Sequence, residues 1–324
     1  MSSTPAWALR AVAERLVLRC LWLTALSAAL LGAAAQPDTL IGHITLDEVV
    51  IRARSEGFDV PTFVQQVRTD TSFHKAFLNT RYHPHNVVSR LAVRGKEERE
   101  LARSHVRGRL VRSGERATLV LDSVAESGRL RDRRGDHRYL TAEMYEEVFF
   151  PKGSFKADNT VAGRRLELER GGRVERYKSE LKKFMFDPGS EIASVPFIGD
   201  KLALYDASMA AYYAHRIWSD DRKGRSCWVF SSNALPDSDP DDTVIKEMDT
   251  WFDKESGLVM ARNYRIAHRS LFLDFDIRIA VENQVMEGQP VPVSVVYEGD
   301  WDIPFAKREI VRFDLHYSDW KIIR

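Results

Sequence analysis

Residues 271–281 read Leu-Phe-Leu-Asp-Phe-Asp-Ile-Arg-Ile-Ala-Val, so apolar and polar side chains alternate through most of this stretch. A period of two places successive side chains on opposite faces of a β-strand, one face buried and the other in water. Residues 311–317, Val-Arg-Phe-Asp-Leu-His-Tyr, repeat the pattern. Both stretches therefore predict long strands with one apolar row and one polar row.

Turn signals separate these strands from their neighbours. Residues 253–257 (Asp-Lys-Glu-Ser-Gly) and 287–289 (Glu-Gly-Gln) each place a glycine where a tight hairpin needs a positive φ. Similar alternation recurs in other segments of the chain. These are residues 87–93, 106–111, 117–121, 213–217, 227–230 and 244–252. The sequence therefore predicts an α+β, β-rich fold built on a long antiparallel meander.

Helical patterns occur in two places. Asp59 and Pro61 are typical of the first positions of a helix, and apolar residues then recur at spacings of three and four as far as Phe77, with a break near Asp70. A shorter helix is predicted from Asp200 to Tyr212. Residues 44–51 are instead predicted to form a short strand. The two helical segments need an apolar partner, and the sheet is the expected one.

The N-terminus has the pattern of a secretory signal peptide. Arg10, Arg15 and Arg19 precede the apolar run 20–31, which ends in Gly-Ala-Ala-Ala-Gln at 32–36. Cleavage after Ala35 would remove these arginines and one glutamate, a net charge of +2, so the chain's +1 would become −1. That balance gives no support to nucleic-acid binding. Export with a single remaining cysteine indicates a bacterial periplasm.

The sequence has no recognisable catalytic signature. The motifs G-x-S-x-G, G-x-G-x-x-G and H-E-x-x-H do not occur, and neither does a phosphate-binding P-loop. We therefore expect a protein that is not an enzyme and needs no cofactor. The alternative from another class is a metal-dependent periplasmic hydrolase that uses His74, His83 and His85, two of which are two residues apart.

Three irregular segments have two interpretations each. The mixed-charge run 129–138 is either a surface for an anionic headgroup or partner, or a solvated loop, and the cancelling signs favour the loop. The apolar stretches 149–155 and 195–199 are interrupted by proline and glycine. They are either packed loops or covers over a cavity, and packing is the commoner case.

Residues 250–259, Thr-Trp-Phe-Asp-Lys-Glu-Ser-Gly-Leu-Val, resemble the W-F-D-x-x-T-G-L hairpin of outer-membrane lipoprotein-sorting proteins, the LolA/LolB-like superfamily. The arrangement of signal peptide, early amphipathic helix and meander is also similar. Within that superfamily, residues 213–319 look most like a divergent exported group of undefined function. The resemblance implies an unclosed β-barrel covered by helices, with an apolar cavity for acyl chains or a lipidated partner. Separately, residues 46–50 (Leu-Asp-Glu-Val-Val) resemble the segment before the plug of TonB-dependent receptors, which implies an envelope protein as partner.

We therefore predict a periplasmic, non-catalytic carrier or binding protein for a lipid or lipoprotein acyl chains. A structural partner of TonB-dependent envelope machinery is a further alternative. The predicted domains are a signal peptide (1–35), a strand and amphipathic helix (36–86) and a half-barrel (87–324) with a helical or loop insertion around 153–212. Apolar side chains of the helices and the meander are predicted to line the cavity. They are Phe63, Val67, Phe73, Phe77, Leu204, Tyr212, Trp251 and Phe275.

Overall fold

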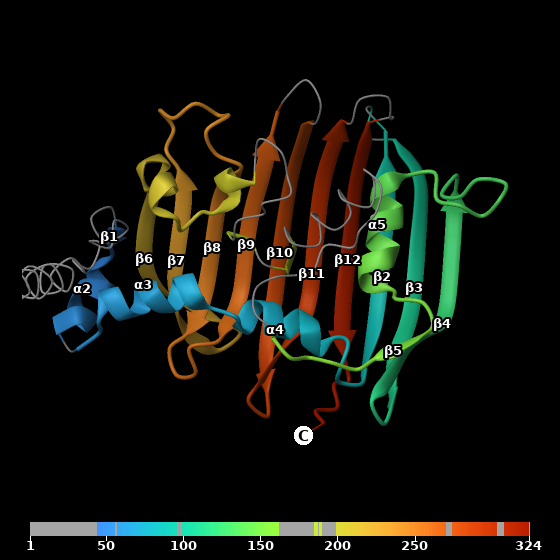
Figure 1. The fold of residues 1–324 in the computed structure, drawn as a ribbon, viewed down its shortest axis with the longest axis horizontal. Helices are drawn as coiled ribbons and strands as arrows, with labels where there is room; N and C mark the ends of the chain where they lie inside the picture. The colour runs from blue at the N-terminus through green and yellow to red at the C-terminus, as the bar shows by residue number, and fades with distance from the viewer. Residues whose placement is uncertain are drawn as a thin grey trace, which may run out of the picture. The chain divides into compact units, whose positions relative to one another are not determined.

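Twelve strands form one open sheet in the computed structural model, in the order β1-β6-β7-β8-β9-β10-β11-β12-β2-β3-β4-β5 (Figure 1). β1 runs parallel to β6, and the other neighbouring strands are antiparallel. β1 and β5 stand at the two edges and do not pair with each other. The predicted β-rich fold with an unclosed antiparallel meander is confirmed.

The chain divides into two compact units, Met1–Thr39 and Leu40–Arg324, and the described residues all belong to the second. The predicted signal peptide, the strand residues 271–273 and much of the predicted insertion lie outside the described residues. The structure describes residues 44–55, 57–95, 97, 99–161, 185–186, 188–189, 199–269, 274–302 and 308–323.

The strands follow the predicted alternation closely. Their bounds are β1 (Ile44–Leu46), β2 (His85–Arg94), β3 (Glu100–Ser113), β4 (Arg116–Gly128), β5 (Ser154–Lys156), β6 (Tyr213–Arg222), β7 (Arg225–Ala234), β8 (Ile245–Asp253), β9 (Val259–His268), β10 (Asp274–Met286), β11 (Gln289–Asp302) and β12 (Glu309–Ser318). The helices are α2 (Glu48–Ser55), α3 (Val60–Thr69), α4 (Ser72–Asn79) and α5 (Leu140–Phe149), with short 3₁₀ helices η2 (Asp200–Leu202) and η3 (Ala207–Tyr212).

α3, α4 and α5 lie on the same side of the sheet (Figure 1). We call this side the helix face. Residues paired across neighbouring strands point to the same side of the sheet, so the register identifies the helix-face residues of each strand. The residues Phe230, Tyr264, Ile279, Tyr297, Phe313 and Leu91 belong to it and to the main core. The opposite side, the outer face, carries charged rows such as Arg278, Glu298 and Arg312, which are paired in register.

The amphipathic segment forms two helices, as the break near Asp70 predicted. Asp59 caps α3, since its carboxylate accepts a hydrogen bond from the Thr62 N–H at 3.2 Å. The Asp70 carboxylate accepts the N–H of Ser72 at 2.9 Å at the start of α4. The Gln66 side chain donates to the Gly257 carbonyl at 2.8 Å, which fixes α3 to the β8–β9 hairpin. Gly257 has the predicted positive φ, +72°.

Two local predictions are wrong. Residues 44–51 do not form one strand, because Asp47 ends β1 and caps a helix; its carboxylate accepts the Glu48 N–H at 3.0 Å and α2 follows. The helix predicted from Asp200 to Tyr212 is two short 3₁₀ helices, η2 and η3, separated by a turn in which the Asp206 N–H donates to the Ala203 carbonyl at 2.9 Å. At residues 44–51 the short-range contact of Asp47 overrides the strand pattern.

Candidate functional site

α5 is fixed to the sheet at its N-terminus by a buried carboxylate. The N–H groups of Leu140 and Thr141 donate to Glu309 at the start of β12, at 3.0 and 3.1 Å. A helix begins with unpaired N–H groups and a partial positive charge, and a carboxylate satisfies both. One turn on, the Tyr145 ring centroid lies 4.4 Å from that of Phe313, and the Tyr145 hydroxyl hydrogen-bonds with Ser89 of β2. α5 therefore covers β12 and β2.

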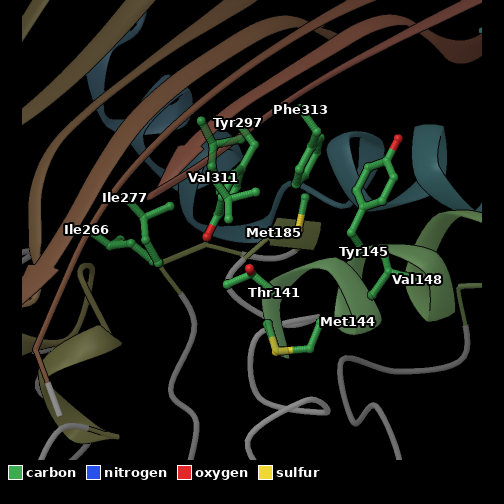
Figure 2. A pocket seen from close by; sticks show the side chains of 11 residues that line it. Thr141, Met144, Tyr145, Val148, Met185, Ile266, Ile277, Tyr297, Val311 and Phe313 are labelled. Carbon is green, nitrogen blue, oxygen red and sulfur yellow. The ribbon is translucent and has the colours of Figure 1, made fainter. Parts of the chain in front are cut away.

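A narrow apolar cavity, which we call the α5 seam, separates α5 from the sheet (Figure 2). Its volume is about 30 Å³, which is room for about one or two water molecules. Figure 2 shows α5 side chains such as Met144 and Val148 on one side and strand side chains such as Ile277 and Val311 on the other. Such a small space is core packing, so the seam is not the candidate site.

A larger cavity lies beyond Tyr145, and we call it the β4 pocket. Its volume is about 310 Å³, at the lower end of the range of small-molecule sites. Tyr145 lines both cavities and so separates them. The pocket has a sheet side and a cover. The sheet side is Leu91, Ser104, Val106, Leu119, Leu121, Val124 and Glu126; the cover includes Ala142 and Tyr145 of α5 and residues 150–153 after it.

A β-bulge gives the pocket its apolar floor. The register between β3 and β4 shifts at Arg107/Gly108, which leaves Asp122 of β4 without a partner residue. Strict alternation along β4 would place Leu121 and Val124 on opposite faces of the sheet. The extra residue turns both to the helix face, where they line the pocket. The bulge thus extends the apolar row by one residue toward the end of β4.

The pocket opens toward β4. Leu121 and Val124 line it and are nevertheless 47% and 51% exposed. Leu91 and Ala142, at its inner side, are only 3% and 1% exposed. The mouth is therefore at the free side of β4, and the closed end is beneath α5. An elongated apolar group could enter from that side and end against Tyr145.

A charged cluster stands at one wall of the pocket. Glu146 of α5 accepts hydrogen bonds from Arg131 at 2.6 Å and Lys152 at 2.9 Å, and it contacts His137 Nε2 at 2.5 Å. Arg131 also pairs with Glu126 of β4 at 3.1 Å. Burial opposes ionisation of Glu146, but the hydrogen bonds from Lys152 and Arg131 outweigh it and lower its pKa.

Burial and the nearby Arg131 charge lower the pKa of His137 below its ordinary value. The other members of the cluster are two cations, Arg131 and Lys152, and two anions, Glu126 and Glu146, whose charges balance. The interpretation of residues 129–138 as a purely solvated loop needs correction. Arg131 and His137 turn inward, because Glu126 and Glu146 offer them partners at the pocket wall.

Seven of the eight predicted site residues, all except Trp251, belong to the main hydrophobic core or pack against it. Phe63 lies 5.4 Å from Phe252 and 6.3 Å from Phe230, between ring centroids. Phe73 packs on Phe77 at 5.4 Å. None of the eight lines the α5 seam or the β4 pocket. Exposed fractions are 6% or less for Phe63, Val67, Phe73, Phe77, Leu204, Trp251 and Phe275, and Tyr212 is half-buried.

Trp251 needs a correction of its own. It is paired with Val229, whose neighbours in sequence, Trp228 and Phe230, pack on the main core. Trp251 therefore faces the outer side, in a small cluster with Val229 and Cys227, and its indole N–H donates to Asp220 at 2.9 Å. The neighbouring Phe252 occupies the helix-face position instead.

The three histidines of the alternative hypothesis have other contacts. His85 stacks on Trp320 with centroids 4.2 Å apart and hydrogen-bonds through Nδ1 to the His83 carbonyl at 2.8 Å. His83 Nδ1 accepts the Ile323 N–H at 3.1 Å. Burial lowers the pKa of both rings to about 4. Among the described residues, no three or more His, Cys, Asp or Glu side chains are grouped so that they could hold a metal ion.

The sequence interpretation missed α5 itself. Residues 140–149, Leu-Thr-Ala-Glu-Met-Tyr-Glu-Glu-Val-Phe, have apolar side chains at positions 140, 144 and 148, and this helical spacing could have revealed it. The sequence of residues 149–155 predicts either a packed loop or a cover over a cavity. Residues 150–153 do line the β4 pocket. Residues 195–198 of the second such stretch lie outside the described residues.

No protein-family model matches the chain, and no curated protein matches it significantly. Among solved structures, the chain is similar to a LolA superfamily protein from Nitrosomonas europaea, with 12% identity, a TM-score of 0.24, and coverage of 78% of this chain and 93% of that one.

Two further structures are similar. A putative outer membrane lipoprotein-sorting protein domain from Vibrio parahaemolyticus has 10% identity and a TM-score of 0.24, covering 77% of this chain and 91% of that one. A DUF1329 family protein from Desulfovibrio piger has 9% identity and a TM-score of 0.23, covering 80% and 89%. In the described part of the chain, no helix has the length and apolarity to cross a membrane.

Proposed function

We propose that this protein binds or carries an apolar ligand, a lipid or the acyl part of a lipoprotein, in the β4 pocket. The observation that carries the proposal is a cavity of about 310 Å³ with an apolar floor and a mouth at exposed Leu121 and Val124. Each methylene taken from water into such a space contributes about 0.8 kcal/mol. Part of one acyl chain would therefore bind with useful affinity.

The charged cluster favours particular headgroups. Arg131 and Lys152 are already neutralised by Glu126 and Glu146. A fully anionic headgroup would have to displace Glu146 from its partners, and a neutral or zwitterionic one would not. We propose that the cluster accommodates a headgroup or peptide backbone without net charge while the chain end lies beneath α5.

The test is binding of a fluorescent palmitoyl lysophosphatidylcholine, whose headgroup is zwitterionic, to wild type and to two charged variants at the mouth, read as the probe's increase in emission. Val124→Glu and Val124→Lys should each weaken binding by about tenfold or more, because a charge in an apolar contact costs more than about 1.4 kcal/mol. Using both signs separates loss of apolar contact from attraction or repulsion of the probe's headgroup.

Val111→Glu is the matched control. Val111 belongs to the neighbouring strand β3, is similarly exposed at 44%, and does not line the pocket. It should bind the probe as wild type does. Failure of wild type to bind, or an equal loss in the Val111 variant, would refute the proposed site.

We further propose that the protein acts in the periplasm after removal of residues 1–35, on the strength of the basic, apolar and small-residue pattern at 10–36. A lipidated or envelope protein would then be the source or recipient of the ligand. N-terminal sequencing of the protein recovered from a periplasmic fraction should begin near Gln36. Recovery of intact Met1 from the cytoplasm would contradict this.

A further inference from the structure

β4 presents an unpaired backbone edge beside the pocket mouth. One edge of β4 pairs with β3. Along the other edge, β5 pairs only with Arg116–Thr118, and no other strand of the described residues pairs with β4 there. Residues 120–128 are all exposed (β4 and β5 in Figure 1). The N–H and C=O groups along such an edge can bond to water or to another extended backbone. A partner strand would find its hydrogen-bonding groups already in line.

The two sides of this edge differ in chemistry. On the helix face, Leu121 and Val124 form the apolar mouth of the pocket. On the outer face, the register places Arg109, Arg107 and Arg103 of β3 beside Val120, Ser123 and Ser127 of β4. A strand added to β4 would therefore have one row of side chains over an apolar surface and the other row near three arginines.

The arginines retain an excess of positive charge. Arg109 lies 3.6 Å from Asp122 and Arg103 lies 3.6 Å from Glu100, both as exposed pairs. Exposed pairs at such distances hold each other weakly. Arg107 is exposed and makes no ion pair with any described residue. Acidic side chains in the added strand would meet complementary charge.

A second copy of this chain fits the edge poorly. Two β4 strands joined about a two-fold axis would bring the arginine rows of both copies to the same face of one continuous sheet. On that face β4 offers the arginines one acidic residue, Asp122, which Arg109 already contacts at 3.6 Å, so a second copy adds like charge and no new anion. The chemistry of the edge therefore selects a different partner.

We propose that the β4 edge binds an extended polypeptide whose apolar side chains alternate with acidic ones. Its backbone pairs with residues 119–128, its apolar row covers the mouth of the β4 pocket, and its acidic row faces the long side chains of Arg103, Arg107 and Arg109 across β4. This is strand addition, in which backbone hydrogen bonds give affinity and alternate side chains give specificity. It goes beyond the proposed function and does not depend on it.

The experiment uses the whole protein and a short fluorescein-labelled peptide of alternating valine and glutamate, with binding measured by anisotropy. A valine–lysine peptide of the same length tests charge, and a valine–glutamate peptide interrupted by prolines tests backbone pairing. Arg107→Glu should weaken the valine–glutamate peptide about tenfold and favour the lysine peptide. Arg278→Glu, an exposed outer-face arginine on β10, is the matched control and should leave binding unchanged.

Hydrogen exchange distinguishes backbone pairing from charge attraction, because charge attraction alone would not protect the backbone amides of β4. Binding of the valine–glutamate peptide should protect amides within 119–128, and the proline peptide should protect none. Equal binding of the two charged peptides, no protection in β4, or an unchanged Arg107→Glu variant would overturn the proposal. So would a dimer of the free protein that protects the same amides. Arg107→Glu should keep its affinity for the fluorescent lysophosphatidylcholine, so failure of this proposal is distinguishable from failure of the proposed function.

Discussion

The two ends of the helix face are covered by helices of similar length but enclose very different interiors. Under α3 and α4, aromatic rings from helix and sheet interlock, and Phe63 reaches both Phe230 and Phe252. Under α5, Tyr145 and Phe313 fill only the inner part, and the space over β4 stays open at about 310 Å³. A helix over a sheet thus makes a core where large side chains meet and a pocket where the facing residues are small or aliphatic.

The largest expected effect comes from comparing a buried residue at the filled end with a half-exposed residue at the open end. Phe252→Ala should lower the free energy of unfolding by about 3–5 kcal/mol, since Phe252 is fully buried and its removal leaves a cavity. Leu121→Ala, at the open end, should cost less than about 1 kcal/mol because half of the side chain is already in water. Urea titration measures both. Equal losses would mean that the β4 pocket is as tightly packed as the other end.

The buried ion pair at the filled end gives the next effect. Arg262 is 5% exposed, lies 3.8 Å from Asp70 and has its guanidinium 4.3 Å above the Phe73 ring. Asp70→Ala leaves that cation unpaired beneath the α3–α4 break, so we expect a loss of about 3 kcal/mol in the same titration.

At the open end, Glu126→Ala is the counterpart. Arg131 keeps Glu146 as a partner and is 31% exposed, so the loss should stay below about 1 kcal/mol. A larger loss for Glu126→Ala than for Asp70→Ala would show that the charged cluster holds the fold, and that its role at the pocket is secondary.

The same difference explains which features could be predicted from the sequence. Alternation of apolar and polar residues at 274–281 and 311–317 is enough to predict strands with one buried face. The glycines at 257 and 288 are enough to predict the hairpin turns. Aromatic content pointed to Phe63 and Phe73 as cavity residues, yet large side chains fill space when they face one another. Whether a space stays empty depends on which side chains face each other across the fold, and a single sequence does not give that pairing. The bulge at Asp122, which places Leu121 and Val124 on the same face, interrupts the alternation and so could not be predicted from it.

Two hairpin glycines with positive φ differ in their surroundings. Gly257 has φ +72°, and a Cβ there would lie 2.7 Å from the Gln66 amide that holds α3. Gly257→Val should cost about 2–3 kcal/mol, from backbone strain and the displaced hydrogen bond together. Gly114, in the β3–β4 turn, has φ +59° and open space around it. Gly114→Val should cost about 1–2 kcal/mol from strain alone. Identical losses would mean that α3 does not depend on this hairpin.

The smallest effect is the dependence of stability on pH. Asp253 closes the β8–β9 hairpin by accepting hydrogen bonds from Arg225 at 3.0 and 2.8 Å and from the Ser256 N–H at 2.9 Å. The Arg225 bonds, followed by those of Ser256, lower the pKa of Asp253 from 3.8 to about 2. A carboxyl whose pKa is lower in the folded state stabilises the fold above its unfolded pKa, and that stability is lost as the pH falls through the folded pKa.

Wild type should therefore lose about 1–2 kcal/mol of its free energy of unfolding between about pH 4 and pH 2 through this group. Asp253→Asn should be less stable at pH 7 and nearly flat across that window. Glu146→Gln, at the open end, should remove a smaller part of the slope. The pKa of Glu146 is also lowered by Lys152 and Arg131, but burial opposes that lowering, and Lys152 is 84% exposed so that water screens its pair. Urea titrations at a series of pH values decide the point. If Glu146→Gln rather than Asp253→Asn removed the slope, the α5 end would be the one held by its charges, and the contrast between a fixed end and an open end would be reversed.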